Sequence, residues 1–221
     1  MEQATDVIIV GGGIIGCAIA YNLCKSGIKV SVLDQGEIGA EASSAAAGLL
    51  APLGSLSGPG PFADLLLTSF ALFPSLVSEL EEVSGIRTEY AHTGALRVVR
   101  HPRYIANLRK RMQEWQPLGL EMHWLSGDEA RQREPLLSSD VYAAIYVPEE
   151  SQISASQLTQ AFAQSALHLG AKLYTRREIT GIQHYHARVT HVHTAQGETI
   201  SCTHLVIAAG PGPFVAVNGS I

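Results

Sequence analysis

The sequence is short of charged residues, and this shortage narrows the classes of protein that it can encode. Charged side chains make up 16% of the 221 residues, whereas hydrophobic side chains make up 46%. Such a chain can bury a sizeable core, so a disordered protein is not expected. Fifteen basic and twenty acidic residues give a net charge of -5, which argues against a general nucleic-acid binder.

Cysteine is also scarce, with only Cys17, Cys24 and Cys202 in the chain and no C-x-x-C pair among them. An odd number of scattered thiols fits a reduced, cytoplasmic setting rather than a disulfide framework. The segment Met1 to Asp6 carries two acids and no base. We therefore expect no signal peptide at the N-terminus.

Common hydrolase signatures are missing as well. No serine occupies a G-x-S-x-G turn, and no H-E-x-x-H is present, so the sequence predicts neither a catalytic triad nor a zinc hydrolase of that kind. We predict no catalytic side chain and no metal site. This absence fits a protein whose chemistry is performed by a bound organic cofactor.

The best-defined stretch is TDVIIVGGGIIGCAIAYNLCKSGIKVSVLD, residues 5–34. The β-branched run Val7–Val10 predicts a buried parallel strand, Ile14–Cys24 a helix, and Val30–Leu33 a second strand. Between the first strand and the helix stands G-x-G-x-x-G, formed by Gly11, Gly13 and Gly16. The order of these elements predicts a dinucleotide-binding βαβ unit.

Each part of this unit has a physical role. Gly11 would make a tight turn, Gly13 would let the backbone approach a pyrophosphate, and Gly16 would let the helix pack closely on the strand. Asp34 ends the second strand, where a carboxylate can accept hydrogen bonds from an adenosine ribose. Two other interpretations are a tight turn without a ligand and a membrane span over the uncharged residues 7–24. Three consecutive glycines stand in the middle of that run and disfavour a span.

A segment of small residues follows, ASSAAAG at 42–48. Ser43 or Ser44 could cap a short helix that begins near Ala45. So little side-chain bulk would let a flat ring or a phosphate lie against the backbone. A close contact between helices explains the same composition equally well.

Together, GGGIIG, Asp34 and ASSAAAGLLAP resemble the FAD-dependent amino-acid oxidases of the D-amino-acid oxidase group, in particular the glycine oxidases. GALRVV at 94–99, LSGDEARQREPLL at 125–137 and LVIAAG at 205–210 agree in order. The resemblance implies FAD as cofactor, with a Rossmann-like α/β FAD-binding domain and part of a second, smaller α+β substrate domain. The implied domains are 1–85, 86–150 and 151–221, the first and last belonging to the FAD-binding domain.

The resemblance also implies which residues bind the cofactor. In chain order, these residues would lie along the pyrophosphate, beside the ribose, in the loop after the second strand and near the flavin. They are Gly11, Gly13, Ile14, Ile15, Gly16, Asp34, Gln35, Glu41, Ala42, Ser43, Ser44, Ala46, Ala47, Gly48 and Leu49. Ile179 would lie near the adenine, and Ala208, Ala209 and Gly210 would close the site.

The implied reaction is oxidative deamination of glycine or another small amine-bearing acid, with hydrogen peroxide as product. The partners implied are a small amino-acid or amine substrate, thiazole synthase in thiamine biosynthesis, and further copies of the chain as a homo-oligomer. Neither nucleic acid nor a membrane is expected as a partner. Family members run to well over 300 residues, so we expect the C-terminal part of the substrate domain to be missing and this chain alone to be inactive.

Later segments carry more ordinary patterns. Helices are predicted over 62–84 (two, or one kinked at Pro74), 101–116, after the capping box of Ser126 and Glu129, and from Ser154 to Leu169. Strands are predicted over 88–99 (two, around Thr93-Gly94), 123–125, 142–147, 172–174, 179–183, 189–194 and 205–208. His184, His186, His191 and His193 could share one face of a meander, although solvated histidines are the simpler interpretation.

Three hypotheses remain. The first is a glycine-oxidase-like flavoenzyme or a sister such as a sarcosine oxidase or D-amino-acid dehydrogenase. The second is a nicotinamide-dependent dehydrogenase, because the same glycine fingerprint serves NAD. The third is a truncated, non-catalytic FAD-binding fragment.

Overall fold

The computed structural model describes residues 5–186 and 188–211, which divide into two compact units. Within these residues, unit 1 takes in everything up to Ala47, residues 78–88 and everything from Ser154 on. Unit 2 consists of residues 48–77 and 89–153. This division differs from the implied domains in residues 48–77 and 151–153, which lie in the second unit, and in residues 86–88, which lie in the first. Within the second unit, Leu49–Leu50 pairs with Ser151–Gln152.

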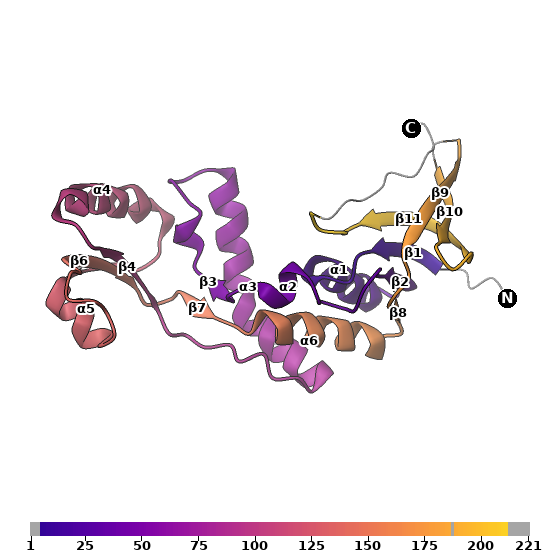
Figure 1. Cartoon of the computed structure of the whole chain (residues 1–221), viewed down its shortest axis with the longest axis horizontal. Helices are drawn as coiled ribbons and strands as arrows, with labels where there is room; N and C mark the ends of the chain where they lie inside the picture. Colours follow the sequence, from indigo (N-terminus) through magenta and orange to yellow (C-terminus); the bar gives the residue numbers. More distant parts are fainter. Residues whose placement is uncertain (1–4, 187, 212–221) are drawn as a thin grey trace. The chain divides into compact units, whose positions relative to one another are not determined.

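Unit 1 is built on a six-stranded sheet in the order β8-β2-β1-β11-β10-β9 (Figure 1). The first four strands in this order run parallel to one another, and β10 runs antiparallel to both of its neighbours, β11 and β9. The strands are β1 (Thr5–Val10), β2 (Val30–Leu33), β8 (Lys172–Tyr174), β9 (Ile179–Tyr185), β10 (Arg188–Thr194) and β11 (Thr199–Ile207). The predicted Rossmann-like sheet with an antiparallel meander is therefore confirmed.

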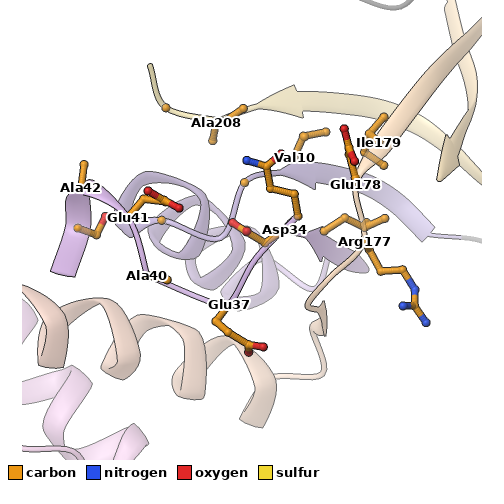
Figure 2. A pocket seen from close by; sticks show the side chains of 18 of the residues that line it. Val10, Asp34, Glu37, Ala40, Glu41, Ala42, Arg177, Glu178, Ile179 and Ala208 are labelled. Carbon is orange, nitrogen blue, oxygen red and sulfur yellow. The ribbon is translucent and has the colours of Figure 1, made fainter. Parts of the chain in front are cut away.

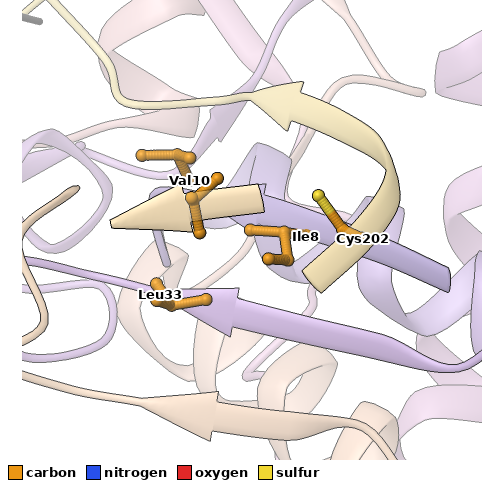
Figure 3. Close-up of a cluster of buried hydrophobic side chains, with 5 residues drawn as sticks. Ile8, Val10, Leu33 and Cys202 are labelled. Atoms are coloured by element: carbon orange, nitrogen blue, oxygen red, sulfur yellow. The ribbon is translucent and has the colours of Figure 1, made fainter. Parts of the chain in front are cut away.

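One face of this sheet carries a hydrophobic core between the parallel strands and the meander. Ile8, Val10 and Leu33 from the parallel strands meet Val192 and Cys202, and Figure 3 shows four of these side chains gathered together. All five are buried. Burial of β-branched and leucine side chains on this scale contributes roughly 1.5–3 kcal/mol each, so the meander anchors the parallel strands that carry the site.

The helices α1 (Ile14–Lys25) and α6 (Ala155–His168) pack together in unit 1. The rings of Tyr21 and Phe162 meet edge to face with their centroids 5.8 Å apart. The Tyr21 hydroxyl donates to Glu79, and this bond together with burial raises the pKa of Tyr21. Helix α6 begins after Ser154, as predicted.

Unit 2 has a three-stranded antiparallel sheet in the order β4-β6-β5. Its strands are β4 (Ala95–Val99), β5 (His123–Ser126) and β6 (Ala143–Val147); β3 (Leu49–Leu50) and β7 (Ser151–Gln152) form a separate pair. Its helices are α4 (Ile105–Trp115) and α5 (Gly127–Arg133), with 3-10 turns at Pro52–Gly54, Pro102–Tyr104 and Gln116–Leu118. The remaining helices are α2 (Ala42–Ala45) in unit 1 and α3 (Pro61–Ser84), whose residues are divided between the units.

A buried ion pair holds unit 2 together. Glu150 is fully buried and pairs with Arg97 through contacts of 2.5 and 2.7 Å. One Glu150 carboxylate oxygen also accepts from the Leu53 backbone N–H at 3.2 Å. The Arg97 guanidinium lies over the ring of Trp115, 5.4 Å from its centroid. Strand β4, the loop after β6, a 3-10 turn and α4 therefore meet at one charged contact.

Several predicted elements of this region need correction. Only the second of the two strands expected around Thr93-Gly94 forms, because Glu89 and Gly94 have positive φ angles of 56° and 68° that interrupt the extended chain. Residue Ala91 instead makes a single bridge to Gln152. The helix expected over 101–116 is shortened by 3-10 turns at both ends. The capping box of Ser126 and Glu129 is confirmed.

Helix α3 is continuous through Pro74, so of the two predicted alternatives the one with two separate helices is wrong. It ends at Gly85, which has a φ of 72° and donates to the Glu81 carbonyl. By length and composition alone α3 could cross a membrane, although core helices of soluble proteins pass the same test. The other candidate span, residues 7–24, is divided between strand β1 and helix α1.

Candidate dinucleotide-binding site

The turn after β1 is shaped by glycines at its two ends. Gly11 has a φ of 105°, and a Cβ at this position would collide with the Ala208 carbonyl oxygen. A Cβ on Gly16 would collide with the Gly11 carbonyl oxygen. A side chain at either position would therefore push the turn away from β11 or push α1 away from the turn.

Asp34 fixes this turn from the end of β2. Its Oδ2 accepts from the Gly12 N–H at 2.6 Å, and its Oδ1 accepts from the Gly36 N–H at 2.7 Å. The Gly12 carbonyl in turn accepts from the Gly39 N–H at 2.9 Å. The acid predicted to hold a ribose is thus already oriented by two backbone donors, and each carboxylate oxygen keeps a further lone pair for a ligand.

The N-terminus of α1 faces the segment 42–45. Its N-cap residue, Gly13, has no side chain with which to cap the helix, and the first turn holds no acid. Ser43 Oγ fills part of this role because it accepts from the Ile14 N–H at 3.0 Å. The prediction that Ser43 or Ser44 caps a helix beginning near Ala45 is therefore wrong. Helix α2 ends at Ala45 instead, and its N-cap is Glu41.

The segment between β8 and β9 is bound to the same strand end as Asp34. The Arg177 N–H donates to the Asp34 carbonyl at 2.7 Å, and the Arg176 N–H donates to the Gly36 carbonyl at 3.0 Å. The Glu178 carbonyl accepts from the Ala195 N–H at 2.9 Å. These bonds fix the backbone of residues 176–178 between the ribose-type acid and the meander.

A pocket of about 540 Å³ lies among these elements (Figure 2). Such a volume is typical of pockets for small molecules and cofactors. It is lined by the turn after β1, the loop after β2, the segment 177–179 and the end of β11, namely Val10, Gly11, Gly13, Leu33, Asp34, Gln35, Glu37, Gly39, Ala40, Glu41, Ala42, Ser43, Arg177, Glu178, Ile179, Ala208, Ala209, Gly210 and Pro211.

Most of the predicted cofactor residues line this pocket. Those that do are Gly11, Gly13, Asp34, Gln35, Glu41, Ala42, Ser43, Ile179, Ala208, Ala209 and Gly210. Ile14, Ile15 and Gly16 open α1, Ser44 lies in α2, and Ala46 and Ala47 follow it, all outside the pocket lining. Gly48 and Leu49 belong to unit 2. The role of every one of these residues in cofactor binding remains a prediction.

The sequence reasoning missed several pocket residues, chiefly Glu37, Arg177 and Glu178. No motif indicates Glu37, whose side chain pairs with Arg176 at 2.9 Å. Arg177 and Glu178 directly precede Ile179, so their position beside a predicted contact residue was the available signal. Arg177 pairs with Glu198 at 2.9 Å.

Cys17 lies under the glycine turn and not in the pocket. Its Sγ donates to the Gly12 carbonyl at 3.3 Å. Burial, and to a lesser degree the charge of Asp34, raises the pKa of this thiol to about 12. A thiol held in its neutral form is a packing and hydrogen-bonding group, as the sequence indicates.

The meander histidines do not gather on one face, so that suggestion is wrong. A bulge between Val189 and His191 pairs His184 with Val189 but His191 with Gln183, which places His184 and His191 on opposite faces. His186 lies in the turn, with a φ of 46°. Within residues 5–186 and 188–211 no group of three or more His, Cys, Asp or Glu could hold a metal ion.

Comparison with known proteins identifies the family. Residues 6–218 match the profile of a family described as DAO, FAD dependent oxidoreductase. The chain belongs to this family of FAD-dependent oxidoreductases. The predicted resemblance and the predicted cofactor class are therefore confirmed, and a nicotinamide-dependent dehydrogenase is not supported.

Individual relatives point in the same direction. The chain is 36% identical over 211 residues to glycine oxidase from Geobacillus kaustophilus, covering 95% of this chain and 55% of the relative. It is 33% identical over 230 residues to the bifunctional protein ThiO/ThiG of a Synechocystis species, of which it covers 33%. The structure of glycine oxidase from Bacillus cereus superposes with a TM-score of 0.88 at 35% identity, covering 93% and 55% of the two chains. The chain thus spans about half the length of the glycine oxidases that it matches.

The pocket of unit 1 fits the nucleotide half of FAD. Gly13 and the N-terminus of α1 offer backbone N–H groups and a positive helix end to a pyrophosphate. Asp34 offers carboxylate oxygens to a ribose. Val10, Leu33 and Ile179 supply an apolar wall for a purine. Among the residues that the structure describes, a Cβ on Gly13 would meet only Ser43 Oγ within 4 Å, so on their side the approach to this backbone is open.

Proposed function

We propose that this chain binds FAD through the pocket of unit 1 and forms part of an oxidase of glycine or another small amine-bearing acid. The single observation that carries the proposal is the contact between Asp34 and the glycine turn, Oδ2 to Gly12 N–H at 2.6 Å. It brings a ribose acceptor and a pyrophosphate-binding backbone to one pocket. Similarity to glycine oxidases over 95% of the chain supports the reaction class.

The chain's own residues bind and orient the cofactor. The N–H groups that open α1 would donate to the phosphates, and the Ser43 hydroxyl, which accepts from the Ile14 N–H, would donate its own proton to a phosphate oxygen. Asp34 accepts from the ribose hydroxyl groups. When bound, FAD supplies the acceptor for the hydride that leaves the amine-bearing carbon of the substrate.

An absorption spectrum of the purified chain tests the proposal. Bands at roughly 375 and 450 nm, typical of a bound flavin cofactor, are expected after the chain is incubated with FAD and desalted into buffer without FAD. Asp34→Ala should lose these bands while Asp6→Ala, an exposed acid on β1 outside the pocket lining, should keep them. A folded, colourless wild-type chain would contradict the proposal.

A second candidate function is FAD binding without turnover, and the observation that favours it is the coverage of about half of each glycine oxidase. A peroxide assay with glycine, sarcosine and D-alanine separates the two. Peroxide formed from one of these by the yellow chain supports an oxidase, and shows which substrate it prefers. A yellow chain that forms none supports the binding function.

The names of the ThiO/ThiG relatives support a further part of the proposal, namely that the product is passed to thiazole synthase. Co-purification of the chain with a thiazole synthase from the same organism would support this step. Identical product release with and without the synthase would argue against it.

A further inference from the structure

Glu41 and Glu178 both line the pocket with carboxylates that have no role in the binding scheme above, and of these Glu178 is the one beside Ile179. Glu178 lines the pocket beside Ile179, and Figure 2 shows both side chains at the end of the pocket away from Glu41 and Ala42. Within the residues that the structure describes, no cation and no hydrogen-bond donor contacts its carboxylate. Glu178 therefore offers a pair of acceptor oxygens to whatever occupies that end.

Two neighbouring charged side chains, Arg177 and Glu37, are already held in ion pairs, which makes Glu178 different from them. Arg177 points away from the pocket in Figure 2 and pairs with Glu198 at 2.9 Å. Glu37, on the wall formed by the loop after β2, pairs with Arg176 at 2.9 Å. Neither of these two charges is available to a ligand without breaking an ion pair.

The backbone fixes the order in which α1, Asp34 and Glu178 follow one another along the pocket. The Arg177 N–H bonds directly to the Asp34 carbonyl. Glu178 is the next residue after Arg177, so its backbone lies close to the acid that is expected to bind the ribose. The phosphate-type donors of α1 lie on the other side of Asp34, next to Ser43. A nucleotide whose phosphates face α1 and whose ribose faces Asp34 must therefore place its base at the end formed by Glu178 and Ile179.

We infer that Glu178 is a specificity-determining residue that accepts a hydrogen bond from the exocyclic 6-amino group of the purine. This inference rests on the proposed function, because it assumes an adenine nucleotide in the pocket. An amino group at the purine 6 position donates to a carboxylate. A carbonyl oxygen at the same position is an acceptor, so it meets the carboxylate with repulsion and leaves both groups unpaired.

ADP and IDP test the inference, since they share ribose and diphosphate and differ in that 6-substituent and in the proton that the IDP base carries at N1. Their affinities for the full chain are measured by titration calorimetry. Wild type is expected to bind ADP about tenfold more tightly than IDP, because a charged hydrogen bond replaces an unpaired acceptor. Glu178→Gln should bring the ratio close to one, because an amide both accepts and donates. Glu178→Ala should lower ADP affinity to near the IDP value.

Glu37→Gln is the matched control because it removes one negative charge from the same pocket. Any general electrostatic gain for an anionic nucleotide appears in both Glu→Gln variants, but only Glu178→Gln should change the ratio of ADP to IDP affinity. Equal affinities in wild type, or a ratio unchanged in Glu178→Gln, would overturn the inference while leaving FAD binding intact. Failure of wild type to bind either FAD or ADP would overturn the proposed function and this inference together.

Discussion

The two units are held by different kinds of contact, and the difference decides what each can tolerate. In unit 1 the pocket is formed by backbone groups that touch through glycines, as Gly11 does with Ala208 and Gly16 does with Gly11. In unit 2 the central contact is an ion pair between Arg97 and Glu150, side chains 53 positions apart. Shape therefore controls the first region, whereas charge compensation controls the second.

A single methyl group should be enough to break the first region. Gly16→Ala places a Cβ inside the contact distance of the Gly11 carbonyl oxygen, and two backbone segments cannot yield as a flexible side chain can. We expect a loss of more than about 3 kcal/mol in the free energy of unfolding, at the upper end for an overpacked site. FAD binding should be lost as well. Urea unfolding and the flavin absorption measure the two effects.

Gly36→Ala is the control for that change. A Cβ on Gly36 would lie 3.6 Å from Asp34 Oδ1, an ordinary van der Waals contact in the same loop region. This variant should retain both stability and flavin binding. Equal damage from the two substitutions would show that the close approach of α1 to the turn is not what constrains Gly16.

The second region should break through loss of charge. Glu150→Ala leaves Arg97 largely buried without its partner and removes the acceptor of the Leu53 N–H. Removing one member of a buried pair costs about 3 to 5 kcal/mol. Because the ion pair belongs to unit 2, flavin binding by the fraction that stays folded should be less affected than in Gly16→Ala. Chemical denaturation followed by tryptophan fluorescence is suited to this variant, since Trp115 lies against Arg97.

The exposed pair Arg100 and Asp140 gives the matched comparison in the same unit. Its atoms approach to 2.7 Å, yet both side chains are largely exposed. Asp140→Asn should leave the unfolding midpoint almost unchanged at neutral pH.

A double variant Arg97→Met/Glu150→Leu should recover part of the stability lost in Glu150→Ala, because no unpaired charge then remains. No recovery would mean that packing, not charge, explains the loss.

The same contrast, between contacts close together and far apart in the sequence, explains how much of the structure could be predicted from the sequence alone. The turn of unit 1 is local, and its glycines, helix and Asp34 stand in a fixed order, so the sheet, α1 and most of the pocket could be predicted. Arg97 lies on β4 and Glu150 lies in the loop that follows the neighbouring strand β6, and no spacing rule links the two positions. Ser43 was expected to serve its own helix. It caps α1 instead, because Gly13 has no side chain to do so.

Ser43 also offers a way to sharpen the comparison, since its side chain, like that of Asp34, bonds to the backbone of the region around the glycine turn. Ser43→Ala removes the acceptor of the Ile14 N–H and should cost about 1 kcal/mol of stability. Its FAD affinity should fall severalfold. Ser44→Ala is the control, because Ser44 lies outside the pocket lining and its Oγ donates to the carbonyls of Ala40 and Glu41. If both variants bind FAD equally well, Ser43 has no part in holding the phosphates.

At Cys17 an effect on stability is expected only in alkali. Burial and the nearby Asp34 raise the pKa of this thiol from 9.0 to about 12 in the folded chain. Between these values the unfolded chain loses the proton while the folded chain keeps it, so the free energy of unfolding should fall as the pH rises from 9 toward 12. Cys17→Ala should reduce that slope while leaving Cys24 and Cys202, whose thiol pKa values are also raised by burial, to contribute the rest. Urea titrations at pH 8 and pH 10 measure it. A slope unchanged in Cys17→Ala would mean that the thiol under the glycine turn is hydrated, and that the close packing of this region stops short of Cys17.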